Sequence, residues 1–261
     1  MEIVARLRAA GCVFAEDEAA LLAAAARDAA ELESMVRRRV SGEPIEYIVG
    51  WAEFRGRRYA IEAGVFVPRH RSELLVEQAI VLATPGAVVL DLCCGCGALG
   101  LAVQQHVPVE LHAADIDPVA LRCARRNGVG AVHAGDLFQA VPATLRGRIA
   151  VLLVNAPYVP TAAIEFLPAE FRDHEAPAAL DGGPDGTDVQ RRVLREAAHW
   201  LAPGATLLTE TSERQAPRLV EVAHAHGLQA HPVTDTGSET TLVLARRRPE
   251  NRPEQKAPDI S

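Results

Sequence analysis

The stretch from Val88 to Gly100, Val-Val-Leu-Asp-Leu-Cys-Cys-Gly-Cys-Gly-Ala-Leu-Gly, decides the fold of this chain. It begins with an apolar run rich in β-branched residues, which is typical of a buried strand. Glycines at 95, 97 and 100 follow, and then a segment with helical periodicity begins. A strand that passes through a glycine turn into a helix predicts the first unit of an open α/β sheet.

The same turn is a candidate binding site. Gly95-x-Gly97-x-x-Gly100 has the spacing of the dinucleotide fingerprint, with an acid twenty residues after the first glycine at Asp115. Asp91 favours a different interpretation, because a carboxylate at the end of the strand would repel a pyrophosphate. S-adenosylmethionine (SAM) has no phosphate there but carries an ammonium group and a sulfonium, both of which suit an acid. We therefore expect SAM, with NAD-linked oxidoreduction as the alternative.

The composition is that of a globular protein with an adequate core. Of the 261 residues, 49% are hydrophobic and 23% are charged, and the net charge of -7 argues against a broad electrostatic grip on nucleic acid. Five cysteines, an odd number without framework spacing, suit a reducing compartment. The first residues lack an apolar signal core, and no apolar run reaches about eighteen residues. We expect a cytoplasmic protein without membrane contact.

Composition divides the chain into four segments, at residues 1–45, 46–66, 67–245 and 246–261. The first is rich in alanine, leucine, arginine and glutamate and predicts a small helical N-terminal domain. The second contains two short apolar runs, Tyr47–Trp51 and Arg58–Ile61, which predict a β-hairpin linker. The third predicts the main α/β domain. The fourth, from Arg246 onward, is too polar to pack and predicts a disordered tail.

Seven short apolar runs in the main domain predict strands, at residues 87–92, 109–114, 131–133, 149–154, 205–210, 228–233 and 240–245. The run 149–154 is almost wholly apolar, as expected of a central strand. The last two runs are predicted to pair as an antiparallel hairpin. Ser72 is the predicted N-cap of a helix before the first strand. The pattern predicts a Rossmann-like sheet, with a long irregular segment at 159–186.

Polar residues stand where the strands end or shortly after, at Asp91, Asp115, Asp136 and Asn155. In open α/β sheets, ligands bind at the carboxyl ends of the strands. We assign a ribose-binding role to Asp115, with a solvent-facing acid as the alternative. Asp117 is assigned a structural role, as the N-cap of the helix that begins at Pro118. Asp136 and Leu137 are candidates for flanking an adenine.

Cys93, Cys94 and Cys96 suggest a metal site, but sulfurs this close in a tight turn do not converge easily on one ion. We expect no metal, and we interpret the three as small polarizable side chains beside a ligand. The nine histidines are scattered along the chain, and we expect them at the surface.

Asn155-Ala156-Pro157-Tyr158 follows the central strand and is the second candidate site. An asparagine side-chain oxygen and the next backbone carbonyl can both accept hydrogen bonds from one planar NH2 group. Pro157 stiffens the turn, and Tyr158 offers a flat wall. When an amide or aryl amine donates both of its N–H hydrogens to these two acceptors, its lone pair is favoured to localise toward a methyl donor. Holding the nitrogen in line with the methyl carbon supplies much of the rate advantage. The alternative is a strand-exit turn with an Asx cap.

These motifs together resemble the HemK (PrmC) family of protein glutamine methyltransferases, which modify a glutamine side-chain amide in translation release factors. The resemblance covers roughly residues 40 to 245. Its other parts are Gly42–Gly50 with Glu53-Phe54, Val67-Pro68-Arg69 with Glu73, and the Leu180–Gly186 loop. Three departures from the family pattern are Ala156 for proline, the cysteines in the glycine turn, and His70-Arg71-Ser72 in the Pro-Arg segment.

The resemblance implies a Rossmann-like seven-stranded SAM-dependent methyltransferase with a release factor as its protein substrate. The predicted cofactor-binding residues are Asp91, Cys93, Cys94, Gly95, Cys96, Gly97, Asp115, Asp136, Leu137 and Asn155. The predicted catalytic residues are Asn155, Pro157 and Tyr158, and substrate binding adds Ala156. The alternatives are a methyltransferase acting on another protein, a small molecule or an exocyclic amine of a nucleic acid, and a SAM-binding or partner-docking protein without catalysis.

Overall fold

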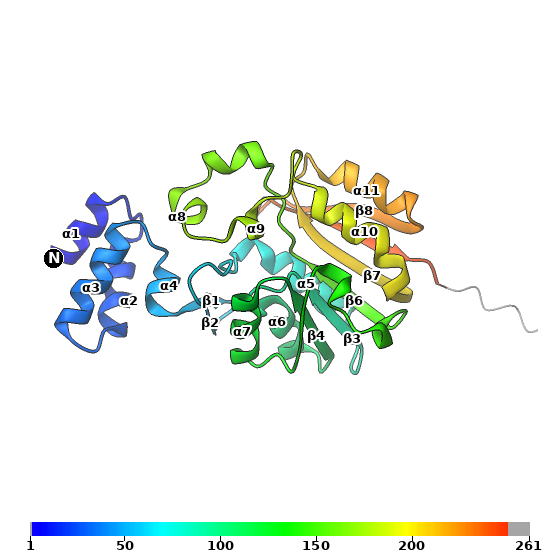
Figure 1. Cartoon of the computed structure of the whole chain (residues 1–261), viewed down its shortest axis with the longest axis horizontal. Coiled ribbons are helices and arrows are strands. Elements are labelled where there is room, and N and C mark those ends of the chain that lie inside the picture. Colours follow the sequence, from blue (N-terminus) through cyan, green and yellow to red (C-terminus); the bar gives the residue numbers. More distant parts are fainter. Residues whose placement is uncertain (1, 250–261) are drawn as a thin grey trace, which may run out of the picture.

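A computed structural model describes residues 2–249, with a helical bundle at one end and an α/β body at the other (Figure 1). The bundle consists of α1 (Glu2–Ala9), α2 (Ala15–Ala25), α3 (Ala29–Val40) and α4 (Ile45–Val49). Its small core contains Leu7, Leu22, Val36 and Ile48. The sequence predicted a small helical domain in this region.

The strand predicted at residues 47–51 is wrong, because Ile45–Val49 form the short helix α4. Ile48 is buried in the bundle and Ile45 and Val49 pack against the same core, so the apolar spacing is helical. Gly50 ends the helix with a left-handed φ of 79°. The boundary predicted at residue 45 therefore separates two parts of one packed unit.

The predicted hairpin is present but begins later, with β1 (Trp51–Phe54) antiparallel to β2 (Arg57–Ala60). Arg55 and Gly56 connect them and both have positive φ, at 50° and 72°. Two left-handed residues make the turn that matches the twist of a two-residue hairpin.

The main sheet has seven strands in the order β5-β4-β3-β6-β7-β9-β8. They are β3 (Val88–Leu92), β4 (Glu110–Asp115), β5 (Ala131–Ala134), β6 (Ile149–Val154), β7 (Leu201–Thr211), β8 (Leu228–Asp235) and β9 (Thr240–Arg247). The first five are parallel, and β9 is antiparallel to both β7 and β8. The seven predicted strands and the terminal hairpin are confirmed.

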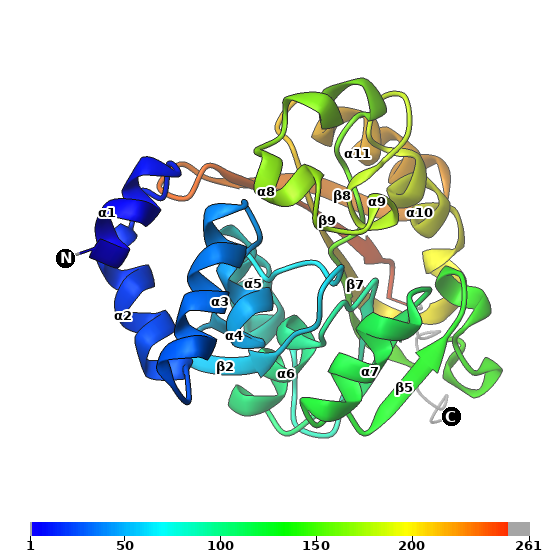
Figure 2. The same cartoon turned by 60° about the vertical axis from the view of Figure 1, so that its left-hand side comes forward.

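Helices cover both faces of this sheet (Figures 1 and 2). One apolar core joins the sheet to α5 (Glu73–Leu82), α6 (Ala98–His106) and α7 (Pro118–Arg126). The other joins it to α10 (Asp188–Trp200) and α11 (Ala216–Ala225). Side chains alternate between the two: Val151 and Leu153 lie in the first core, and Leu152 and Val154 in the second.

The segment predicted as irregular, 159–186, contains short helices. They are a 3-10 helix at Thr161–Phe166, α8 (Ala169–Arg172) and α9 (Pro177–Leu180). Arg39 of α3 is buried and pairs with both Glu18 of α2 and Glu170 of α8, so an ion cluster joins this segment to the bundle.

The predicted tail falls mainly on residues 250–261, which lie outside the described residues, and β9 continues to Arg247, two residues past the predicted boundary. Within residues 2–249, no helix is both long and apolar enough to cross a membrane.

Candidate active site

A cavity of about 750 Å³ opens at the carboxyl ends of the parallel strands. Its walls come from the turn after β3, the ends of β4 and β5, the turn after β6, and the segment that carries α8 and α9. Every candidate site residue predicted from the sequence lines this cavity except Gly97. Strands β3 and β6 are neighbours: β4 and β5 follow β3 on one side of it, and the chain then crosses over to β6 on the other side. That switch point is where an open α/β sheet binds its ligand.

Asp91 lies at the floor of the cavity and is almost wholly buried, at 1% exposure. Its Oδ2 accepts a hydrogen bond of 2.9 Å from the backbone N–H of Gly100 in α6. A Cβ at position 100 would lie 2.8 Å from Leu111 and 3.0 Å from Asp91, which is why glycine stands there. Burial raises the pKa of Asp91 to about 7. A cation beside it would favour the ionised form.

The turn after β3 is held by backbone groups. The N–H of Gly95 donates to Asp115 Oδ2 over 2.8 Å, and the N–H of Cys94 donates to the carbonyl of Ala114 over 3.1 Å. Gly97 has a φ of 79°, and a Cβ there would come within 2.8 Å of Val129. Gly97 therefore shapes the turn from outside the cavity.

All three turn cysteines line the cavity, and Cys93 adopts a left-handed φ of 61°. Burial raises the pKa of the Cys93 and Cys94 thiols, and that of Cys96 to about 12, so the three are neutral near pH 7. Among residues 2–249, no group of three or more His, Cys, Asp or Glu side chains is placed to hold a metal ion.

Asp115 accepts two backbone hydrogen bonds, the one from Gly95 and one of 3.0 Å from the N–H of Asp117. Burial raises its pKa. Asp117 caps α7 through a 2.8 Å bond from the N–H of Val119, which confirms its predicted structural role. Asp136 is half-exposed and pairs with Arg192 of α10 over 2.6 Å.

A hydrogen-bonded network surrounds the turn after β6. Asn155 Nδ2 donates to the Ser72 hydroxyl over 3.3 Å, and that hydroxyl donates to Glu210 Oε2 over 2.6 Å. The Tyr158 hydroxyl donates to Glu210 Oε1 over 2.8 Å, and Arg71 Nε lies 3.1 Å from the same oxygen. Burial raises the pKa of Tyr158, which keeps the phenol neutral.

Ser72 stands at the predicted N-cap position of α5, but its side chain does not cap the helix. Ser72 has helical backbone angles, φ -72° and ψ -2°, and its side chain makes no capping hydrogen bond to α5. The hydroxyl is fully buried and points instead at Glu210.

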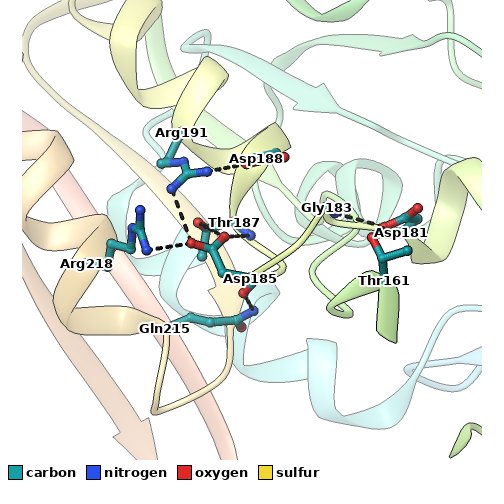
Figure 3. A network of polar contacts seen from close by, with 9 residues as sticks. All are labelled: Thr161, Asp181, Gly183, Asp185, Thr187, Asp188, Arg191, Gln215 and Arg218. Carbon is teal, nitrogen blue, oxygen red and sulfur yellow. Dashed lines mark hydrogen bonds and ion pairs between the residues drawn. The ribbon is translucent and has the colours of Figure 1, made fainter. Parts of the chain in front are cut away.

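Hydrogen bonds and ion pairs hold the loop from Asp181 to Thr187 (Figure 3), and Gln215 joins this loop to the Tyr158 turn. Gln215 Nε2 donates to the backbone carbonyls of Tyr158 and Asp185, each over 2.9 Å. Asp185 also pairs with Arg191 and Arg218. Gly186 has a φ of 76°, and a Cβ there would overlap both Gln215 and the Tyr158 carbonyl. The loop and the turn therefore form one rigid unit.

Arg69 lines the cavity and anchors one of its walls. Its guanidinium lies 3.8 Å from the ring centre of Phe171 and 4.9 Å from that of Phe66, and it pairs with the buried Glu175. Glu175 Oε2 is buried without a hydrogen-bond partner, and burial raises the pKa of this carboxyl.

Sequence reasoning missed Glu210, Arg71 and Glu175 as site residues, and it gave Ser72 only a helix-capping role. Glu210 was detectable, because it closes the strand predicted at 205–210 in the same way that Asp91 follows an apolar run. Arg71 and Glu175 reach the cavity only through tertiary folding, and no local pattern marks them.

Comparison with known proteins agrees with this geometry. A family model described as methyltransferase small domain matches residues 62–183. A release factor glutamine methyltransferase from Bradyrhizobium diazoefficiens is 33% identical over 255 residues, covering 92% of this chain and 86% of that protein. A 4-amino-L-phenylalanine/4-methylamino-L-phenylalanine methyltransferase from Streptomyces pristinaespiralis is 36% identical over 207 residues, covering 75% and 70%.

Among solved structures, the Mtq2-Trm112 complex of E. cuniculi, described as responsible for methylating the eRF1 translation termination factor, has a TM-score of 0.51 at 17% identity. It covers 71% of this chain and 99% of that chain, and the likeness supports the fold. The identity and coverage of the Bradyrhizobium relative go further. The chain belongs to the release factor glutamine methyltransferase family, and it is a SAM-dependent methyltransferase.

Proposed function

We propose that this enzyme methylates the side-chain amide nitrogen of a glutamine in a peptide chain release factor, in the cytoplasm. One observation carries the proposal: the Asn155–Tyr158 turn and the Asp91–Asp115 side line a single cavity. The name and coverage of the Bradyrhizobium relative support a release factor as the acceptor. Five unpaired cysteines support a reducing compartment.

The cofactor side of the cavity fits SAM. Two buried or half-buried carboxyls, Asp91 and Asp115, suit its ammonium group and its ribose hydroxyls, and the glycine turn leaves room for a ligand against the backbone. Leu137 and Asp136 are assigned to the adenine. The turn cysteines Cys93, Cys94 and Cys96 are assigned to packing contacts with the cofactor. When bound, SAM supplies a methyl group as an electrophilic carbon on a sulfonium.

The acceptor side holds a planar nitrogen. Asn155 Oδ1 and the Ala156 carbonyl accept hydrogen bonds from the two N–H groups of the amide. Tyr158 packs against the flat face, and Pro157 fixes the turn. Polarised in this way, the nitrogen directs its lone pair at the methyl carbon, and its positioning supplies most of the rate advantage. The nitrogen loses one proton to solvent after transfer, so no strong base is required.

The test is transfer of labelled methyl from SAM to purified release factors of the same organism. We expect label on one glutamine, located by mass spectrometry, and no label after that glutamine is replaced by alanine. Label that stays on the substituted protein, or no label on any release factor, contradicts the proposal.

A second candidate acceptor is a small aryl amine with an amino-acid carboxylate. The Streptomyces relative is named for such a substrate. Arg71 supports it, because its half-exposed side chain lines the cavity 5.6 Å from the ring centre of Tyr158. 4-Amino-L-phenylalanine in the same assay separates the two candidates.

A further inference from the structure

Glu210 contacts two candidate acceptor-binding residues, Tyr158 directly and Asn155 through Ser72. Its carboxylate, 2% exposed at the end of β7, accepts a hydrogen bond from the Ser72 hydroxyl on Oε2 and one from the Tyr158 hydroxyl on Oε1. Ser72 in turn contacts the Asn155 amide over 3.3 Å. None of these three links is local in sequence, since Ser72, Tyr158 and Glu210 come from three separate elements.

The direction of each proton follows from the donors available. An ionised carboxylate only accepts, so the single hydroxyl proton of Ser72 is committed to Glu210. The Ser72 oxygen can then only accept from Asn155, and the group that faces it must be the NH2. Which end of an asparagine amide points where is set by its hydrogen-bond network. The Asn155 oxygen is therefore left for the acceptor.

We propose that Glu210, acting through Ser72, holds the Asn155 amide in the one orientation that presents its oxygen to the acceptor nitrogen. Glu210 and Ser72 are thus positioning residues for methyl transfer. The inference deepens the proposed function and depends on the acceptor role given there to Asn155.

The substitution Glu210→Gln gives a specific prediction. The position next to Tyr158 faces two donors, the phenol O–H and Arg71 Nε–H, so it takes the glutamine oxygen. The glutamine NH2 then faces Ser72, whose oxygen accepts from it. The Ser72 proton turns to Asn155, which must present its oxygen to Ser72. The amide flips, and an N–H group faces the acceptor.

The first test observes the flip without an acceptor. The chain has three asparagines, at 127, 155 and 251, so selective labelling with 15N-asparagine gives three side-chain amide signals. Asn155→Ala identifies the signal of interest. We expect an NOE between the Asn155 amide protons and the Ser72 β-protons in the wild type, and its loss in Glu210→Gln. An NOE that persists in Glu210→Gln overturns the proposal.

The second test is kinetic and uses whichever acceptor the wild type methylates. We expect Glu210→Gln to lower kcat about 100-fold, as for loss of one oriented polar group at a reacting centre. Ser72→Ala removes the hydroxyl that would force the Asn155 amide to flip. It should lower kcat only about tenfold, which corresponds to the loss of one hydrogen bond. The double variant should recover to within about threefold of Ser72→Ala, because no hydroxyl remains to enforce the wrong orientation.

Rescue by a second substitution distinguishes positioning from damage to the fold. Losses that simply add in the double variant overturn the proposal, as does wild-type turnover in Glu210→Gln. If Glu210→Gln does not fold, Ser72→Ala and Ser72→Thr replace it: threonine keeps the hydroxyl and the NOE, and alanine speeds hydrogen exchange of the Asn155 amide. Unchanged exchange in Ser72→Ala contradicts the inference. The NMR result is independent of the acceptor, so failure of the release-factor assay leaves it intact.

Discussion

The two halves of the cavity are built differently. On the cofactor side, Asp91 and Asp115 bind backbone N–H groups within the same β-α-β region, and neighbouring glycines make the space. On the acceptor side, side chains bind side chains across distant segments, as in the Ser72–Glu210–Tyr158 network. Because backbone hydrogen bonds shape the cofactor side, its turn can carry three cysteines. The geometry of the acceptor side depends on each side chain of the hydrogen-bonded network.

The largest effect should come from the acceptor side. Asn155→Ala removes the only side-chain acceptor proposed for the reacting amide, and we expect kcat to fall about 1,000-fold, at the upper end for one polar group. Calorimetry should find the SAM affinity within about twofold of wild type, because Asp91 and Asp115, the carboxyls assigned to the cofactor, are unchanged and effects at separate sites are nearly independent. Turnover that survives the substitution would remove the acceptor role of Asn155.

The reverse result is expected on the cofactor side. Asp115→Ala loses the charge-assisted bonds assigned to the ribose and frees the N–H of Gly95, so SAM should bind about 100-fold more weakly. Asp115→Asn is the matched control, because it keeps one acceptor oxygen and should lose less. With SAM saturating, kcat should change little, and undiminished affinity by calorimetry would exclude the ribose role.

A smaller effect concerns pH. The pKa of Asp91 is raised to about 7 by burial, so below pH 7 the neutral acid prevails and attracts the SAM cation less. We expect SAM affinity to fall up to about tenfold per pH unit below 7 and to be level above it. Asp91→Asn should flatten this profile, and a slope that remains in the variant would assign it to another group.

The same carboxyl affects the ligand-free fold with the opposite sign. The pKa of Asp91 in the folded protein lies above its ordinary value of 3.8. The contribution of this carboxyl to the free energy of unfolding is therefore complete below pH 3.8 and is lost as the pH rises through 7. Thermal unfolding of the ligand-free enzyme should therefore lose stability between pH 4 and 7 relative to Asp91→Asn.

The smallest effect tests the backbone character of the glycine turn. Cys93 holds a left-handed φ of 61°, which costs a non-glycine residue about 1–2 kcal/mol. Cys93→Gly should raise Tm by about 2 °C in a chain of this size. Cys94→Gly, at a neighbouring position without positive φ, is the control and should lower Tm. A drop in Tm for Cys93→Gly would show that its thiol packing outweighs the strain.

The same contrast explains what the sequence could predict. The seven strands, the glycine turn, the Asp117 cap and the terminal hairpin follow from local periodicity and turn chemistry. The β-strand predicted at 47–51 is wrong because a run of five apolar residues is too short for its periodicity to distinguish a strand from a helix. Packing of Ile48 in the core of the bundle selects the helix. Ser72 precedes α5 as predicted, but its hydroxyl does not cap the helix because it donates a hydrogen bond to a buried carboxylate 138 residues away.

The ion cluster of Arg39, Glu18 and Glu170 ties the bundle to the roof of the acceptor chamber. Arg39 is buried and binds carboxylates of both α2 and α8, so a displacement of the bundle would also displace α8 or break these ion pairs. Phe171 of α8 lines the cavity, so the position of the small N-terminal bundle is coupled to the shape of the cavity wall.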